Sequence, residues 1–307
     1  MTNSIPVLLD TDIGSDIDDA VALAYLLQQP RCELLGITTV TGDVGKRAAC
    51  AEVICRATGR TDMPIHCGAS NVLLIGPGQP RVPHYEAIRK RLHQTSWPAN
   101  TAVDFLRQTI HERPGQITLL TIGPLTNIAL LFAIDPEIPG MLRQLVSMDG
   151  IYFRQDRREW NSLVDPIATA IVYAANTRQH ISIGLDVTLQ CQMTAAEVRD
   201  RFRTPPLDMV TEMADVWFGH AEKLTFHDPL AAATIFRPEL CDYVNGHVEV
   251  SINNEAGLAG LTYFTEAPDG PHRIARSVKP DAFFAEFFSI FTQTGSPTLL
   301  FGERSRT

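Results

Sequence analysis

The stretch Val7-Leu8-Leu9-Asp10-Thr11-Asp12-Ile13-Gly14-Ser15-Asp16-Ile17-Asp18-Asp19-Ala20 joins an apolar run to a segment of helical character. We expect residues 5–10 to form a buried strand. Residues 18–29 should form a helix whose acidic first turn suits the positive end of the helix dipole. Five aspartates fall within ten residues between the two elements. In open α/β sheets the carboxyl ends of the strands are where ligands bind, so this junction is the first candidate site.

The rest of the chain continues the alternation of apolar and amphipathic segments. Further strands are predicted at residues 34–40, 116–122, 145–148 and 180–185, and further helices at residues 44–58, 99–112, 166–175 and from Leu125 onward. Residues 194–236 should be mainly helical, residues 244–277 should form antiparallel strands, and residues 281–293 a last helix. Apolar strands between helices are typical of a mostly parallel sheet that is covered on both faces. We therefore expect an open, mostly parallel, Rossmann-like α/β sheet flanked by helices, with C-terminal helical and antiparallel β elaboration. Residues 1–307 should form a single domain.

Composition narrows the class of protein. The chain has 307 residues, 45% of them hydrophobic, and a formal net charge of −9. An acidic balance argues against nucleic acid or an anionic membrane as the main partner. No apolar run is long enough to span a bilayer, and residues 1–9 lack the cationic start and apolar stretch of a signal peptide. The six cysteines lie mostly in apolar segments without a CxxC, which predicts reduced, buried thiols in a cytoplasmic protein.

The acidic stretch predicts a metal site. So many carboxylates are costly to pack together unless a cation neutralises them, although a solvated acidic turn before a capped helix is the structural alternative. Oxygen-only ligands favour calcium or magnesium over zinc. An EF-hand loop is excluded because Gly14 and Ser15 stand at its fifth and sixth positions, after a strand. A magnesium-dependent phosphatase with Asp10 as nucleophile fits Asp10-Thr11-Asp12 but leaves the later aspartates unexplained.

The same stretch resembles the N-terminal signature of the inosine–uridine-preferring nucleoside hydrolases, D-x-D-x-G-x-D-D-A, with two residues added. When both ends are aligned, the resemblance assigns the family's catalytic base and metal ligand to Asp12. The pair at the helix start becomes Asp18, which would hold a ribose hydroxyl, and Asp19, which would bind calcium. Because of the added residues, Asp16 is an alternative to Asp18 in either role.

Two downstream segments also resemble the family. Residues 38–43, Thr-Thr-Val-Thr-Gly-Asp, are similar to its T-T-V-x-G-N, with Asp43 in place of the asparagine that contacts the sugar. Asp43 would alternatively cap the following helix. Residues 122–127, Ile-Gly-Pro-Leu-Thr-Asn, are similar to its G-P-L-T-N segment. There the resemblance assigns the backbone carbonyl of Ile122 to the metal.

Two motifs in the second half of the chain complete the resemblance. Residues 159–161, Glu-Trp-Asn, resemble the family's E-F-N, whose Glu and Asn clamp the ribose hydroxyls. On an extended segment Glu159 and Asn161 would point the same way. Residues 227–229, His-Asp-Pro, resemble its H-D-P. Asp228 would complete the calcium shell, and His227 is a candidate acid for the leaving group.

The resemblance covers roughly residues 5–290 and implies calcium-dependent hydrolysis of the N-glycosidic bond of ribonucleosides, which yields ribose and a nucleobase for salvage. The implied partners are a ribonucleoside and further copies of this chain, as a homodimer or homotetramer. The implied calcium ligands are Asp12, Asp19, Asp228 and the Ile122 carbonyl, with Asp16 as a further candidate.

The implied mechanism divides the work among these residues. Asp12 would accept the proton of a water that calcium polarises. Asp18, Glu159 and Asn161 would fix the sugar. His227, with a pKa near physiological pH, would protonate the leaving base.

Some features stay open at the level of sequence. Candidate walls of a base pocket are residues 74–85, including His84, and the region around Trp217 and His220. Residues 148–150, Met-Asp-Gly, stand where the family commonly has M-G-G. Besides the phosphatase, a non-catalytic calcium-dependent sensor of sugars or nucleosides is an alternative. The presence of Asp12 argues against a sensor, because a sensor needs no base.

Overall fold

The structure, a computed structural model, describes residues 4–154, 156–255 and 257–292. Its main sheet has nine strands in the order β10-β9-β11-β6-β5-β4-β1-β2-β3. Their bounds are β1 (Ile5–Thr11), β2 (Cys32–Thr39), β3 (Ile65–Cys67), β4 (Thr118–Thr121), β5 (Gln144–Ser147), β6 (His180–Ser182), β9 (Cys241–Val250), β10 (Thr262–Glu266) and β11 (His272–Val278). A separate antiparallel pair joins β7 (Gln192–Thr194) to β8 (Lys223–Thr225).

Most of the main sheet is parallel. β1 pairs with β2 and β4, and parallel pairing continues to β3 on one side and through β5 and β6 to β11 on the other. β9 runs antiparallel to both β11 and β10. The strand order reverses between β1 and β4, and in doubly wound sheets the crevice outside the carboxyl ends at such a point binds ligands. The predicted fold class is confirmed, and it places a site beyond Thr11 and Thr121.

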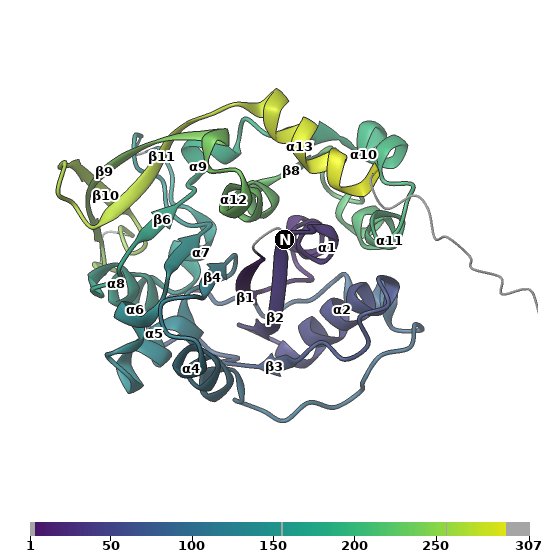
Figure 1. Ribbon diagram of the computed structural model, residues 1–307, viewed down its shortest axis with the longest axis horizontal. Coiled ribbons are helices and arrows are strands. Elements are labelled where there is room, and N and C mark those ends of the chain that lie inside the picture. Colours follow the sequence, from purple (N-terminus) through teal and green to yellow (C-terminus); the bar gives the residue numbers. More distant parts are fainter. Residues whose placement is uncertain (1–3, 155, 256, 293–307) are drawn as a thin grey trace, which may run out of the picture.

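Helices cover both faces of the sheet (Figure 1). Successive residues of β1 face opposite ways, since Val7 and Leu9 belong to one buried apolar cluster and Leu8 to another. The first cluster is completed by α1 (Asp18–Gln28), α2 (Val44–Ala57), α11 (Leu207–Trp217), α12 (His227–Phe236) and α13 (Pro280–Thr292). The second is completed by α4 (Ala102–Glu112), α5 (Thr126–Ile134), α6 (Ile138–Met141) and α8 (Pro166–Ala174). Shorter helices are α3 (Tyr85–Ile88), α7 (Trp160–Val164), α9 (Leu185–Thr188), α10 (Ala195–Arg201) and the 3-10 turn Pro238–Leu240.

The helices α1 and α12 lie side by side, and this contact brings two distant segments together (Figure 1). Apolar residues 20–26 of α1 are all buried. The residue before α12, Phe226, is fully buried, and its ring contacts four other phenylalanines at centroid distances of 5.1–6.4 Å: Phe202, Phe283, Phe284 and Phe287. Aromatic packing of this kind fixes the start of α12 against α13, which also contacts α1.

The structure departs from the sequence-based expectations in a few places. The C-terminal strands are antiparallel to one another as expected, but β11 also pairs in parallel with β6 and so joins them to the main sheet. The pair β7–β8 borders a region expected to be mainly helical. The last predicted helix is α13, and its predicted final residue, Gln293, lies outside the described residues. All six cysteines are free thiols, and no described helix is long and apolar enough to cross a bilayer.

Candidate active site

A cavity of about 280 Å³ lies beyond the carboxyl ends of β1 and β4, where the strand order reverses. The residues that the sequence assigns to catalysis, metal or sugar line it, with the exception of Asp43: Asp12, Asp16, Asp18, Asp19, Ile122, Glu159, Asn161, His227 and Asp228. They come from the β1–α1 loop, the end of β4, the start of α7 and the start of α12. The fold thus brings four separate motifs to one place.

Asp43 is placed elsewhere. Its side chain accepts a hydrogen bond from the Lys46 backbone N–H at 3.1 Å and pairs with the Lys46 ammonium at 3.1 Å. It is nearly half exposed and is absent from the lining of the cavity. The structure therefore supports the alternative that Asp43 caps α2, and it gives no support to a sugar contact.

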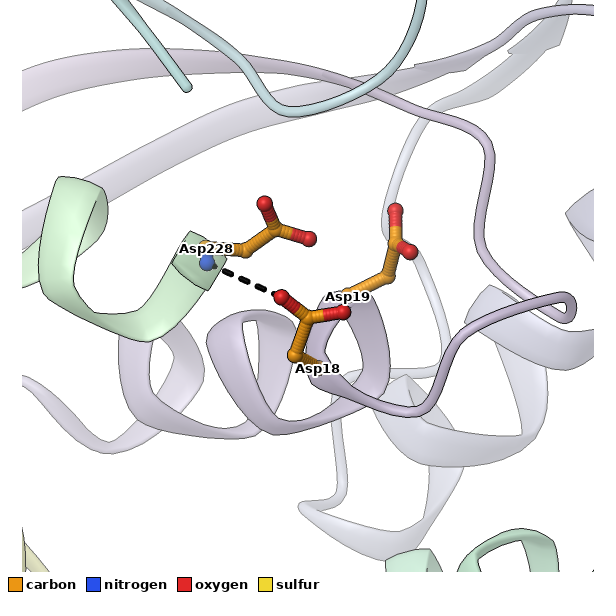
Figure 2. Close-up of side chains that lie close together, drawn as sticks. All are labelled: Asp18, Asp19 and Asp228. Carbon is orange, nitrogen blue, oxygen red and sulfur yellow. Dashed lines mark hydrogen bonds between the residues drawn. The ribbon is translucent and has the colours of Figure 1, made fainter. Parts of the chain in front are cut away.

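Three buried carboxylates form a compact group (Figure 2). Asp18 and Asp19 come from the first turn of α1, Asp228 comes from the first turn of α12, and each offers an oxygen within 4.8 Å of the others. The Asp228 backbone N–H donates to Asp18 Oδ2 at 3.1 Å, and the Thr11 hydroxyl donates to Asp19 Oδ1 at 2.5 Å. Each carboxylate is only 3% exposed.

The electrostatics of this group favour a cation. Burial, followed by repulsion from neighbouring carboxylates, raises the pKa of Asp18, Asp19 and Asp228 well above the usual value. Within the described chain, none of the three forms a salt bridge with a lysine or arginine. The charge of Arg47 lowers the pKa of Asp19 but does not offset burial and repulsion, so the group is stable as anions only when an ion neutralises it. Oxygen-only donors fit calcium or magnesium, so the residues present suit a divalent cation.

The roles of the aspartates overlap more than the sequence predicts. Asp18, expected at the sugar, belongs to the compact group, whereas Asp12, expected at the metal, lies outside it. Asp12 nevertheless lines the same cavity, and its charge helps to raise the pKa of both Asp19 and Asp228. Asp16 is partly exposed, and its carboxylate accepts the Ile17 backbone N–H at 2.6 Å. Burial raises the pKa of Asp16 to about 6.

Residues after β4 touch this acidic loop. The Asn161 side-chain amide donates to the carbonyl oxygens of Ile122 at 3.3 Å and Met148 at 3.0 Å. Gly123 lies so close to the loop that a Cβ placed on it would be 2.8 Å from the backbone nitrogen of Asp12. The absence of a side chain at Gly123 therefore permits the approach of Ile122 to Asp12.

Glu159 lies in a different local conformation from the extended one expected from the sequence. The segment is not extended: Glu159 is the N-cap of α7, accepting the backbone N–H groups of Asn161 and Ser162 at 2.9 Å each, and Asn161 is already helical. Both side chains line the cavity. This cap has no signal in the sequence, because glutamate is not among the residues that commonly cap a helix N-terminus.

Asp149 lies behind Glu159. Asp149 is fully buried, the Ser162 hydroxyl donates to its Oδ1, and its Oδ2 has no donor. Burial, followed by the charge of Glu159, raises the pKa of Asp149 well above its usual value, which favours its protonated form. Asp149, at the departure from M-G-G, is thus an electrostatic neighbour of Glu159.

His227 occupies the predicted place but has a different ionisation from the one expected. Its Nδ1 lies 2.7 Å from the Thr188 hydroxyl oxygen. Burial lowers the pKa of His227 to about 4, so the expectation of a pKa near physiological pH is wrong and the ring is neutral at pH 7. A neutral ring assists a leaving group as a hydrogen-bond donor from Nε2, when the Thr188 hydroxyl donates to Nδ1.

A second hollow adjoins the cavity. The two share Ser15, Asp16, Gln79 and Trp160, and the hollow extends to Arg81, Pro83, Trp217 and His220. Of the expected walls of a base pocket, Trp217 and His220 lie here, whereas His84 is a fully buried side chain outside the lining. Trp160, Arg157 and Arg158, which also line the cavity, were not identified from the sequence, although Trp160 lies within the Glu-Trp-Asn motif.

The geometry does not support Asp10 as a nucleophile. Asp10 is fully buried in β1, and its Oδ2 accepts hydrogen bonds from the Thr38 hydroxyl at 2.5 Å and the Asn127 amide at 2.7 Å. Burial raises the pKa of Asp10 to about 7. It is absent from the cavity lining, so it is not presented to a substrate.

Comparisons with known proteins agree with this geometry. Residues 7–285 match the model of the family "Inosine-uridine preferring nucleoside hydrolase". The non-specific ribonucleoside hydrolase RihC of Salmonella paratyphi C is 33% identical over 276 residues, which are 85% of this chain and 88% of the relative. Uridine nucleosidase 1 of Arabidopsis thaliana is 28% identical over 265 residues, 80% and 77% of the two chains.

Solved structures share the fold. A plant nucleoside hydrolase, PpNRh1, superposes with a TM-score of 0.81 at 23% identity over 94% of this chain and 99% of its own. A purine-preferring ribonucleoside hydrolase from Gardnerella vaginalis gives 0.79 at 24% identity, over 94% and 98%. The chain therefore belongs to the inosine–uridine-preferring nucleoside hydrolase family and is an enzyme of that class. The phosphatase and sensor interpretations are wrong.

The contact between Gly123 and Asp12 yields a first test. Gly123→Ala should displace Asp12 and lower kcat/KM by about 10²-fold, because a small misplacement of a reacting group has effects of that order. Gly140→Ala is the matched control, since a Cβ there meets nothing within 4 Å in α6. Steady-state kinetics of both variants check this. Equal kinetics in the two variants would contradict the close approach at Gly123.

The carboxylate group yields a second test, through pH. Raised pKa values mean that the folded metal-free protein holds protons that the unfolded chain releases, so its stability falls as pH rises. His84 and His227, with pKa values lowered to about 3 and about 4, oppose this only below their ordinary value of 6.5. From about pH 6.5 to about pH 8.5 the melting temperature in chelator should fall, and the increase that calcium produces should grow. Scanning calorimetry at both pH values measures this. A calcium-induced increase that does not depend on pH would argue against ionisation linked to binding.

Proposed function

We propose that this enzyme hydrolyses the N-glycosidic bond of ribonucleosides with the help of calcium. The observation that carries the proposal is the convergence of Asp12, the Asp18–Asp19–Asp228 group and the Glu159–Asn161 pair on one cavity. A polar, carboxylate-lined cavity suits a sugar that develops positive charge as its bond to the base breaks.

The chain offers several oxygen donors for the ion. Asp19 and Asp228 from the compact group, together with Asp12 and the Ile122 carbonyl, would hold calcium, with Asp16 or Asp18 as a further donor. Bound calcium would supply positive charge that offsets the carboxylates and Lewis acidity that lowers the pKa of water.

The residues of the cavity and the solvent together account for each proton in the reaction. The bond between the anomeric carbon and the base nitrogen breaks, and its electron pair leaves with the base. A water oxygen bonds to that carbon, and its proton passes to the Asp12 carboxylate, which later releases it to solvent. Asp18, Glu159 and Asn161 would hold the ribose hydroxyls. The neutral His227 ring would donate a hydrogen bond to the departing base, whose nitrogen then takes a proton from solvent.

The proposal extends to the substrate class, the metabolic role, the domain organisation, the compartment and the oligomeric state. The names of the relatives, a non-specific ribonucleoside hydrolase and a uridine nucleosidase, support ribonucleosides as the substrate class and salvage of bases as the role. The continuous nine-stranded sheet supports one domain over residues 1–307. Free thiols at all six cysteines suit a reducing compartment such as the cytoplasm. A homodimer or homotetramer rests on the family resemblance.

Ribose release is the direct test of this function. Incubation with inosine and with uridine should produce reducing sugar, and prior removal of metal by a chelator should abolish the reaction. Calcium added back should restore it, and p-nitrophenyl phosphate should yield no phosphate. Full turnover by a metal-stripped sample would rule out the calcium part of the proposal, and absence of ribose release from a broad nucleoside panel would rule out the activity.

Substitutions of Asp12 and of His227 should differ in how the loss of kcat depends on the leaving group. Asp12→Asn should lose activity severely on inosine, uridine and a nitrophenyl riboside alike, because the water's proton has no acceptor. His227→Ala should harm the natural nucleosides by about 10²-fold or more but spare the nitrophenyl riboside, whose phenolate leaves without help. Measurement of kcat on both kinds of substrate decides. Equal damage to both in His227→Ala would reassign His227 to orienting Asp228.

A further inference from the structure

Arg47 in α2 is the largest fully buried side chain in the described part of the chain, with 0% of its surface exposed. Arginine is almost never fully buried unless its charge is paired. Within the described residues, however, Arg47 forms no salt bridge with a carboxylate. The charge of Arg47 acts on the carboxylates of Asp12 and Asp19 without a direct contact, since it lowers the pKa that burial raises in both.

The guanidinium of Arg47 donates only to uncharged oxygens. Nε donates to the Thr41 carbonyl at 2.7 Å, and Nη2 donates to the Gln79 carbonyl at 2.7 Å. Nη1 contacts the carbonyls of Asp12 and Ile13, the latter at 3.1 Å, and the Ser15 hydroxyl at 2.9 Å. The acceptors belong to three loops: the acidic loop after β1, the turn after β2, and the segment that leads to α3.

These three loops are also joined to one another around Arg47. The Ser15 hydroxyl donates to the Arg81 carbonyl at 3.0 Å, and the His84 N–H donates to the Gly14 carbonyl at 3.1 Å. The Gln79 N–H donates to the Thr41 hydroxyl at 3.0 Å. Asp12, Ser15 and Gln79 all line the cavity, so the loops that Arg47 ties together form one wall of it.

The conformation of the loops explains why such a tie is needed. Thr41 has a φ of 61°, a left-handed conformation that is unfavourable for a β-branched residue and persists only when its surroundings hold it. The acidic loop carries two residues more than the family signature, and a longer loop has more conformational freedom to lose. The planar fork of arginine satisfies several carbonyls of fixed geometry at once, which a lysine ammonium does less well.

We propose that Arg47 is a positioning residue of the active site, whose guanidinium holds the Asp12 loop against the 79–84 segment. Its role rests on the proposed function, because it acts through Asp12 and through the ion that Asp12 helps to bind. Arg47 itself does not line the cavity. It stands in the second layer around the site, where partners of metal ligands typically change metal affinity or activity by about 10–100-fold.

The test compares Arg47→Met and Arg47→Lys with wild type and with Arg56→Met. Arg56 lies on the same helix and forms an i,i+4 pair with Glu52 outside the cavity, so its variant is the matched control. Three quantities are measured: calcium Kd by calorimetry, kcat and KM for inosine, and the melting temperature in chelator. Arg47→Met should raise the calcium Kd and lower kcat by about 10–100-fold each, with a smaller change in KM. Arg47→Lys should lie between Arg47→Met and wild type, and Arg56→Met should match wild type.

Two outcomes would contradict the proposal. Arg47 variants that melt earlier but keep the wild-type calcium Kd and kcat well below their melting temperature would make Arg47 a purely structural residue. Failure of both Arg47 variants to fold would lead to the same conclusion. If wild type releases no ribose, the proposed function fails, while the calcium Kd still reports whether Arg47 shapes the acidic loop.

Discussion

The mutual repulsion of buried carboxylates at the end of β1 is the constraint on which the site depends. Asp18, Asp19 and Asp228 are almost fully buried within 4.8 Å of one another, with Asp12 beside them. In the absence of positive charge such a group is stable only when protonated, and burial accordingly raises its pKa values. The carboxylate group therefore lowers the stability of the folded chain, and a bound divalent cation would restore it. Metal binding is in this way coupled to folding at the same place where the chemistry occurs.

The surrounding fold holds these repelling groups in position. β1 and β4 are hydrogen-bonded neighbours at the switch point of the sheet, which places Asp12 next to Ile122 and Gly123. The side-by-side packing of α1 and α12 and the hydrogen bond from the Asp228 N–H to Asp18 hold these two aspartates next to each other, and phenylalanines around Phe226 fix the start of α12 against α13. Hydrophobic packing away from the cavity thus balances an electrostatic cost inside it, as is common where function requires a locally unfavourable arrangement.

Local patterns in the sequence were enough to predict most of the fold and many of the residues that line the cavity. Alternating apolar runs predict the strands, and the order of the motifs brings their residues to one cavity. Interactions between distant segments were not readable. Arg47 donates to backbone carbonyls of residues up to 35 positions away. Every residue has such a carbonyl, so the residue type does not reveal the contact. Burial alone shifts the pKa of His227, and burial is set by tertiary packing. The parallel pairing of β11 with β6 was not predicted, because β6 lies far away in the sequence. The cap formed by Glu159 was not predicted either, because glutamate is not among the residues that commonly cap a helix N-terminus.

We expect a single bound ion to stabilise the ionised form of the acidic group. A crystal structure grown with calcium tests this most directly. The account predicts one ion at about 2.3–2.6 Å from carboxylate oxygens of Asp12, Asp19 and Asp228, with the Ile122 carbonyl in the same shell. A structure at saturating calcium that shows no ion in the cavity, or an ion bound elsewhere while these carboxylates stay paired through protons, would contradict it.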